Sequence, residues 1–274
     1  MAQAENDRSS QPEQIRGLVH QAVEAYAAGF QARHLAEVND PEGTINMKIH
    51  NVFIDALGDE TRYFTALVRS LDSSLGNMLE GLAIDIAQLN FIVKRNVEGA
   101  LYREQTQIIA DLLEKYKRRE KRPEVPDYSV LRSINREGAS EVKRHDSDYY
   151  LIDERTNRHC LIELKIGGDL DNKKARSEKE AILEQYAILS NTLPPATEIK
   201  IYFATAYNRY GENEAWTQER VKQYFAEDEF LIGKDFWNFI CCSPRGYELV
   251  ISAYREKAPL IKDALETIKS AYIH

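Results

Sequence analysis

Two apolar segments with a helical segment between them constrain the fold of this chain more than any other feature. Residues 159–166 and 198–207 have the short apolar runs of buried strands, and residues 175–190 between them have helical apolar spacing. A strand, a crossover helix and a second strand build a parallel strand pair. Residues 148–152 form a further apolar run, which the polar turn 153–158 joins to residues 159–166 as a hairpin. The second half of the chain therefore predicts a mixed β-sheet flanked by helices.

The first half of the chain is expected to be helical. Helical apolar spacing covers residues 12–37, a run from about residue 61, and residues 77–93 and 97–119, with Ser73, Ser74 and Gly76 interrupting before the third helix. Later segments predict a helix at 217–225, a short buried strand at 237–242 and a helix at 247–274. This order predicts an α/β (α+β) fold in a single domain, 1–274, with a mainly helical N-terminal part (1–125) and a mixed-sheet core (126–274).

The composition indicates a globular protein, because 43% of the 274 residues are hydrophobic and can supply a sizeable core. No apolar run approaches the roughly 20 residues needed to span a bilayer, and the polar N-terminal sequence lacks the core of a signal peptide. We therefore expect a cytoplasmic protein without a membrane partner. Cys160, Cys241 and Cys242 lie in apolar surroundings without metal-ligand spacing, and we expect them to be buried thiols.

Charged residues interrupt the apolar hairpin at positions that favour metal-dependent phosphodiester chemistry. Glu163 and Lys165 are two residues apart, so their side chains leave the same strand face, where Asp148 from the preceding strand can meet them. Two carboxylates can hold a hard cation through oxygen ligands, beside an ammonium group that can act on an attacking water. The alternative is an edge strand with a surface ion pair. Because burying an unpaired ion costs several kcal/mol, roughly, charges in such an apolar strand require compensating partners.

Other residues near this tract are alternatives for the same roles. Asp146 and Asp153 also lie close to the strands, but Asp146 can cap a turn and Asp153 is at the hairpin turn, so Asp148 is the first choice. His145 is the strongest histidine candidate for a general base. We prefer Lys165 with a metal-bound water, because no Ser-His-Asp or Cys-His arrangement is visible.

Basic residues precede the carboxylate tract, although the net charge of the chain is −8. Six of the eight residues 115–122 are basic, and further basic residues follow between positions 132 and 145. They can contact phosphates, although a solvated helix end gives the same pattern. After the tract, the glycines of loop 167–174 can let backbone amides approach a phosphate. The alternative is a connector in which Asp171 or Asn172 begins the next helix.

Residues 147–148 (Ser-Asp), fourteen intervening residues and residues 163–165 (Glu-Leu-Lys) resemble the PD-(D/E)xK nuclease motif, with serine in place of the usual proline. Nucleases of this superfamily often present a further glutamate from a helix before the sheet, and Glu80 after residues 70–76 resembles that element. The spread of these features is similar to that of type II restriction endonucleases of the TdeIII-like family. The resemblance implies a restriction-endonuclease-like fold and cleavage of double-stranded DNA, with GGNCC as the implied recognition sequence.

The same resemblance implies roles for individual residues. Asp148, Glu163 and the backbone carbonyl of Leu164 would hold one or two Mg²⁺ ions, and Glu80 would contribute directly or through water. Lys165 would orient the attacking water or stabilise charge that develops on the phosphate. Without the resemblance, Glu80 would be interpreted as a solvated helix residue.

Some expectations concern the surroundings of the site and the whole protein. Gln185 and Tyr186 are candidates to lie near the site, because related nucleases sometimes use such a pair on this helix. A homodimer would place one active site on each strand of a near-palindromic target. The alternative functions are a structure-specific DNA repair nuclease of the same superfamily and a catalytically silent nucleic-acid-binding protein on the same fold.

Overall fold

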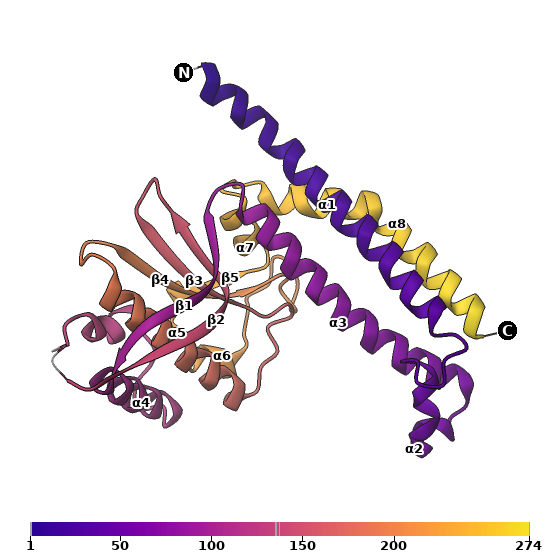
Figure 1. Cartoon of the computed structure of the whole chain (residues 1–274), viewed down its shortest axis with the longest axis horizontal. Coiled ribbons are helices and arrows are strands. Elements are labelled where there is room, and N and C mark those ends of the chain that lie inside the picture. Colours follow the sequence, from indigo (N-terminus) through magenta and orange to yellow (C-terminus); the bar gives the residue numbers. More distant parts are fainter. Residues whose placement is uncertain (1, 135, 137, 274) are drawn as a thin grey trace. The chain divides into compact units, whose positions relative to one another are not determined.

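The computed structural model describes residues 2–134, 136 and 138–273, which fold into two compact units (Figure 1). The described parts of residues 1–86 and 248–274 form the first, which we name the helical unit. The described parts of residues 87–247 form the second, which we name the sheet unit. Within this described part of the chain, every helix is too short or too polar to cross a lipid bilayer.

The helical unit is built from long helices that bury one apolar stripe each. Its elements are α1 (Ala2–Ala36), η1 (Asn46–His50), α2 (Val52–Asp55), α3 (Asp59–Ala87) and α8 (Gly246–Tyr272). Along α1, the buried residues Val19, Val23 and Ala27 recur every four positions, which keeps their side chains on one helix face. An ion pair between Arg16 and Glu256 joins α1 to α8. The predicted helices at 12–37 and 247–274 are therefore confirmed.

The sheet unit contains a five-stranded sheet in the order β1-β2-β3-β4-β5. Its strands are β1 (Ile92–Tyr102), β2 (Ser140–Asp153), β3 (Arg158–Leu164), β4 (Glu198–Thr205) and β5 (Phe230–Ile232). β1, β2 and β3 are antiparallel neighbours, whereas β3, β4 and β5 are parallel. Its helices are α4 (Arg103–Lys117), η2 (Val125–Arg132), α5 (Asn172–Thr192), α6 (Glu219–Lys222), η3 (Glu227–Glu229) and α7 (Lys234–Ile240). The α/β class, the mixed sheet and the parallel pair across a crossover helix are confirmed.

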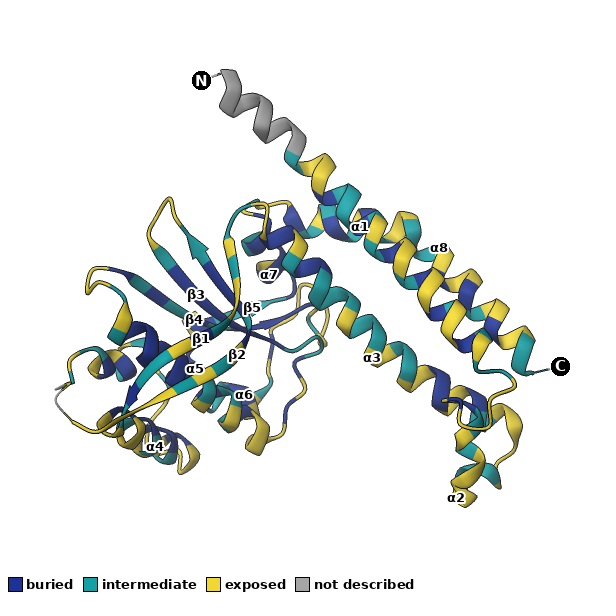
Figure 2. Ribbon diagram, viewed as in Figure 1, coloured by how far each residue is buried: buried dark blue, intermediate teal, exposed yellow. Residues whose placement is uncertain are grey.

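Side chains alternate between the two faces of the sheet, and each face contacts a different helix. Tyr150 and Phe203 belong to the core cluster that includes the buried face of α5. Tyr149, one position away, contacts the ring of Phe236 on α7. Figure 2 shows α5 and the central strands as largely buried. Strand residues that share the face of Tyr150 and Phe203 therefore point towards α5.

The predicted helix at 97–119 is wrong over its first turns, because β1 occupies residues 92–102 and α4 begins at Arg103. β1 pairs with β2 along most of its length, and Gly99 within it is a poor helix former. A Cβ atom on Gly99 would lie 2.8 Å from Cγ2 of Ile188, so glycine also permits the close approach of α5. Long-range pairing and packing thus override the local apolar spacing.

The predicted break at Ser73, Ser74 and Gly76 is also wrong, because α3 is continuous from Asp59 to Ala87. The Ser74 hydroxyl donates to the backbone carbonyl of Ser70 at 2.7 Å, within the helix. Serine satisfied in this way can stay in a helix interior.

The predicted strand at 237–242 is instead the end of α7, because a short apolar run does not by itself distinguish a buried helix from a buried strand. The indole N–H of Trp237 donates to the carbonyl of Ala206 at 2.8 Å and fixes the helix against the chain after β4. Cys160 and Cys241 are buried as predicted. The prediction for Cys242 is wrong, since this residue is exposed in a turn with a φ of 48° just after the helix.

Candidate active site

Asp148 and Glu163 face each other across β2 and β3. Tyr149 pairs with Ile162 in the antiparallel register, so the next step along both strands places Asp148 opposite Glu163. One carboxylate oxygen of Asp148 accepts a hydrogen bond from the backbone N–H of Leu164 at 3.0 Å. Opposite residues of an antiparallel pair point to the same face. The two carboxylates therefore meet on the side of the sheet that α5 covers.

An irregularity in the pairing of β1 with β2 lies at the position of Asp148. Lys94 pairs with Tyr150, and Asn96 pairs with Asp146, so a single β1 residue faces the three β2 residues between these pairs. Such bulges bend a strand and change the direction of its side chains, and they are frequent next to active sites. Asp148 therefore lies within this bulge, and its carboxylate reaches the backbone at the end of β3.

Lys165 directly follows the last residue of β3. Its backbone N–H donates to the carbonyl of Ala204 at 3.0 Å, which extends the contact between β3 and β4 by one step. Its ammonium group forms an ion pair with Glu163 and lies 3.3 Å from Oε1 of Glu178 on α5. The structure thus brings Asp148, Glu163 and Lys165 together and adds Glu178 to them.

Burial changes the protonation equilibria of this cluster. Glu163 is only 9% exposed, and desolvation together with the charge of Asp148 raises its pKa to about 8, against the opposing effect of Lys165. Burial would lower the pKa of Lys165, but the carboxylates of Glu163, Asp148 and Glu178 hold it above its ordinary value. The lysine is therefore charged, while Glu163 changes its protonation state close to neutral pH.

The donor atoms of this cluster suit a hard divalent cation. Among the residues that the structure describes, no three His, Cys, Asp or Glu side chains are grouped so that they could hold a metal ion. An ion would instead take the two carboxylates of Asp148 and Glu163 and fill its remaining positions with carbonyl, water or phosphate oxygens, as Mg²⁺ commonly does. The raised pKa of Glu163 fits such an ion, because a cation beside the two carboxylates favours their charged forms.

The other carboxylates considered from the sequence occupy different places. Glu80 is half-buried on α3, in the helical unit, so its contribution to the reaction centre stays a prediction. Asp146 pairs with Asn96 just before the bulge. Asp153 accepts the backbone N–H of Arg155 at 3.0 Å within the hairpin turn, which is the role predicted for it.

His145 and the two α5 candidates also have clear surroundings. Nε2 of His145 lies 2.9 Å from a carboxylate oxygen of Glu184 on α5, and the ammonium group of Lys143 lies 3.1 Å from the other. Tyr186 is buried with its ring 4.9 Å from that of Tyr128, so it is a core residue. Gln185 is buried as well, and its side-chain oxygen accepts no hydrogen bond from the described residues.

Glu178 is the residue that the sequence analysis missed. It lies in the second turn of α5, the helix that follows the glycine loop after the Glu-x-Lys strand. The neighbouring Lys179 is fully buried and forms an ion pair with the equally buried Glu229 at 2.7 Å, which anchors this part of α5 to η3. Acidic residues in the first two turns of the helix after a Glu-x-Lys strand would have been the signal to examine.

The glycine loop connects β3 to α5, and Asp171 begins the helix as the connector interpretation predicted. Gly168 has a φ of +64°, and a Cβ atom on it would lie 2.7 Å from Cγ2 of Thr205. Asp171 caps α5 by accepting the backbone N–H of Lys174 at 2.8 Å. An approach of the loop's backbone amides to a phosphate stays a prediction.

The basic residues before the tract have different surroundings. Those in residues 115–122 are exposed around the end of α4, where several of them line a cavity of about 480 Å³ together with Lys222. Arg132 and Arg136 instead donate to the backbone carbonyls of Thr197 and Ser190, at 2.6 and 2.9 Å. Arg132 and Arg136 therefore fix the chain around the end of α5, whereas the basic residues at 115–122 form a solvated basic surface.

Comparison with known proteins identifies a family to which this chain is similar. The family model described as "Type II restriction endonuclease, HinfI" matches residues 13–257, which include Asp148, Glu163 and Lys165. No curated protein and no solved structure gives a significant match. The match supports a type II restriction endonuclease and does not extend to the narrower TdeIII-like resemblance or to the PD-(D/E)xK motif. The chain therefore belongs to the HinfI family of type II restriction endonucleases.

Proposed function

We propose that this enzyme hydrolyses phosphodiester bonds of double-stranded DNA at a short specific sequence in an Mg²⁺-dependent reaction centred on Asp148, Glu163 and Lys165. The observation that carries the proposal is the meeting of these side chains on one face at the end of β3. The family match over residues 13–257 supports the cleavage of DNA, because its members are type II restriction endonucleases.

The residues of the cluster would have different roles in the reaction. Mg²⁺, when bound, polarises the scissile phosphate and lowers the pKa of a coordinated water. Asp148, Glu163 and the carbonyl of Leu164 would supply oxygen ligands, with Glu80 contributing directly or through water. Lys165 would orient the attacking water or stabilise negative charge on the phosphate. The resemblance to PD-(D/E)xK nucleases implies products with a 5′-phosphate and a 3′-hydroxyl.

Recognition and assembly are further parts of the proposal. GGNCC is supported only by the resemblance to TdeIII-like enzymes, since base-contacting residues have no local sequence signature. A homodimer is supported by the need for one reaction centre on each strand of a duplex. Sequencing the ends of the fragments from a digest tests the recognition sequence directly.

Digestion of a plasmid with and without Mg²⁺ tests the proposed reaction. The parent protein is expected to give discrete fragments with Mg²⁺ and none with a chelator. Lys165→Ala should lower the cleavage rate by about a hundredfold or more, because it removes the group that acts on the attacking water. Lys262→Ala, which removes an exposed lysine of α8, is the matched control and should cut like the parent.

The same digest distinguishes the alternatives. Cleavage by Lys165→Ala at the parent rate, with an unchanged melting temperature, would contradict the assignment of Lys165. Cutting restricted to ends, nicks or branches would indicate a repair nuclease. A protein that binds duplex DNA without cutting it under any metal condition would indicate a silent binding protein.

A further inference from the structure

The helical unit contains a cavity of about 600 Å³ between the end of α1, the segment 42–51 and α3. All of its lining residues belong to this unit. The cavity therefore exists independently of Asp148, Glu163 and Lys165, which belong to the sheet unit.

Positive charge predominates in this cavity, which we name the α1–α3 cavity. Arg33, Lys48 and Arg69 line it, against the single carboxylate of Glu42. The other polar lining groups are hydroxyls and amides, from Thr44, Asn51, Ser70, Ser73, Ser74 and Asn77. Among the described residues, Lys48 and Arg69 form no ion pair, although the chain as a whole carries a net charge of −8. Cations together with hydroxyl and amide donors match an anion that has several acceptor oxygens, as a phosphate does.

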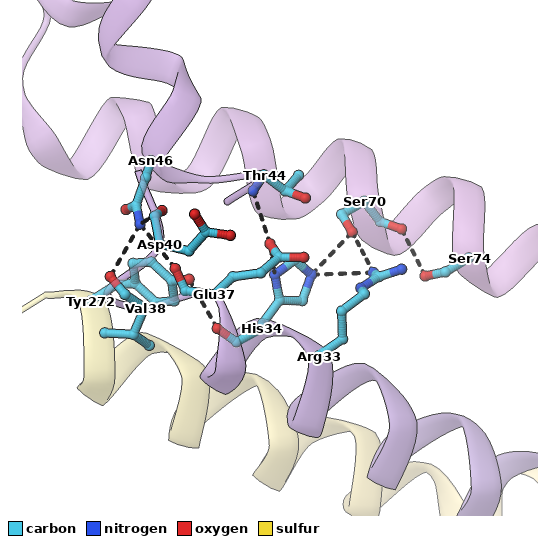
Figure 3. Close-up of polar contacts among 10 residues, drawn as sticks. All are labelled: Arg33, His34, Glu37, Val38, Asp40, Thr44, Asn46, Ser70, Ser74 and Tyr272. Atoms are coloured by element: carbon cyan, nitrogen blue, oxygen red, sulfur yellow. Dashed lines mark hydrogen bonds and ion pairs between the residues drawn. The ribbon is translucent and has the colours of Figure 1, made fainter. Parts of the chain in front are cut away.

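Arg33 is fixed at the cavity by its neighbours (Figure 3). Its Nη2 donates to the hydroxyl of Ser70 at 2.8 Å and lies 3.3 Å from Nε2 of His34. Its guanidinium carbon lies 5.3 Å from the centre of the Phe30 ring. These contacts use one nitrogen and one face of the guanidinium group. The Nε and Nη1 donors make no hydrogen bond with the described residues and can donate to a ligand.

His34 explains how Arg33 is held without a carboxylate partner. The side chain is fully buried, and desolvation and the charge of Arg33 both lower its pKa, so the imidazole is neutral at pH 7. Since Arg33 has only donors, Nε2 of His34 is the acceptor, and the Ser70 hydroxyl at 3.0 Å donates to it. The Ser70 oxygen is then left to accept from Arg33. The arrangement orients the cation and leaves its charge for a ligand.

Ser70, His34 and Glu37 have the residue types of a hydrolase triad, but their geometry does not favour one. Nδ1 of His34 is 3.8 Å from Glu37, and the same carboxylate oxygen accepts the backbone N–H of Thr44 at 2.8 Å. A triad requires a hydrogen bond between the acid and the imidazole. Anion binding therefore fits the cavity better than nucleophilic catalysis.

We propose that the α1–α3 cavity binds one backbone phosphate of duplex DNA, other than the scissile one, through Arg33, Lys48 and Arg69. This proposal rests on the proposed function, because it takes duplex DNA as the substrate. Phosphate contacts fix the position of a protein on a duplex and carry no sequence information. The cavity would therefore strengthen binding to every duplex to the same degree and would leave the recognition sequence unchanged.

The experiment measures duplex binding as a function of salt in full-length protein that carries Lys165→Ala to prevent cleavage. The probes are two labelled duplexes, one with the sequence found at the digest ends and one unrelated. In this background, Lys48→Ala/Arg69→Ala should weaken both complexes by about eightfold at 0.1 M salt and reduce the slope of log affinity against log salt by about 0.9, the contribution of one phosphate. Lys262→Ala/Arg255→Ala removes the same two residue types from the exposed surface of α8 and is the matched control.

Each result has a definite meaning. Equal losses for both duplexes, with the control unchanged, support the proposal. Affinity and salt slope equal to those of the control would overturn it, and so would a loss confined to the cognate duplex, which indicates base recognition. If inorganic phosphate raises the melting temperature of the Lys165→Ala protein but not of the cavity variant, while duplex binding is unchanged, the ligand is a free phosphate and not DNA.

Failure of the Lys165→Ala protein to bind any duplex would contradict the proposed function itself. Arg69→Glu serves as a second variant, because Arg69 is exposed and its replacement leaves the core intact.

Discussion

The protonation of Glu163 links the stability of the fold to pH. Its pKa is about 8 in the folded protein, compared with an ordinary value of 4.5. Between these values the unfolded chain has lost the proton that the folded chain keeps, so folding becomes less favourable as pH rises through this window. Each pKa unit corresponds to about 1.4 kcal/mol, which makes the total effect about 5 kcal/mol at most.

Glu163→Gln should therefore gain stability relative to the parent as pH rises from 5 to 8, in the presence of a chelator. The reason is that glutamine has no proton to lose, so the variant lacks the penalty that builds up in the parent. Thermal melting at several pH values measures the difference. Added Mg²⁺ should reduce it, because a cation beside Asp148 and Glu163 favours the charged carboxylates. Parallel pH profiles for the two proteins would show that Glu163 has an ordinary pKa.

Glu178 should matter for the rate of cleavage and not for DNA affinity. Its carboxylate lies 3.3 Å from the Lys165 ammonium and helps to hold it beside Glu163. Glu178→Gln should lower kcat by about tenfold, as is common when the partner of a site residue is removed, and leave the dissociation constant for duplex DNA unchanged. Glu180→Gln, two positions along the same helix and exposed, is the matched control. Equal rates for both variants and the parent would exclude a positioning role for Glu178.

The positions of the candidate side chains on β2 and β3 could be predicted from the sequence, whereas the position of Glu178 on α5 could not. The two-residue alternation of strands was enough to place Glu163 and Lys165 on one face and Asp148 opposite them. Glu178 could not be placed in the same way, because its position depends on how α5 packs on the sheet. The bulge at Asp148 was not predictable either, since it arises from the register with β1, a strand that the local spacing assigned to a helix.

At the scale of elements, the loop between β3 and α5 joins the strand of Glu163 to the helix that carries Glu178. Gly168→Ala should destabilise the sheet unit by about 1–3 kcal/mol, because the residue has a φ of +64° and its Cβ would lie 2.7 Å from Thr205. Denaturant unfolding measures this loss, and cleavage should decline with it. As a contrast, Gly17→Ala should stabilise α1 by about 1 kcal/mol at most, because nothing lies within 4 Å of a Cβ there. An unchanged midpoint for Gly168→Ala would show that the loop can relax.

The predicted elements that were correct are those whose pattern is local and repeated. α5 and α8 carry long apolar stripes, and β4 is rich in apolar and aromatic residues, so each was located from the sequence pattern alone. β1 and α7 were assigned to the wrong class because their apolar runs are short. Pairing with β2 determines the strand conformation of β1. The hydrogen bond from Trp237 to Ala206 helps to fix α7.

At the scale of the whole molecule, one chain offers a single set of Asp148, Glu163 and Lys165, whereas a duplex has two strands to cut. We therefore expect a dimer with a mass of twice 31.5 kDa, about 63 kDa, in solution or on the target duplex. Light scattering combined with size-exclusion chromatography measures this mass, with Lys165→Ala used for the DNA complex. A monomer that cuts both strands at one site in a single binding event would contradict the expectation.

The division of the chain has a consequence for its biosynthesis. The helical unit is assembled from both ends of the chain, while residues 87–247 between them form the sheet unit. On the ribosome, the strands and helices of the sheet unit are made before α8. The helices α1 and α3 therefore cannot pack with α8 until after the sheet unit has been synthesised. The segment that carries Asp148, Glu163 and Lys165 can therefore fold first, and the α1–α8 contact between Arg16 and Glu256 can form only after α8 has been made.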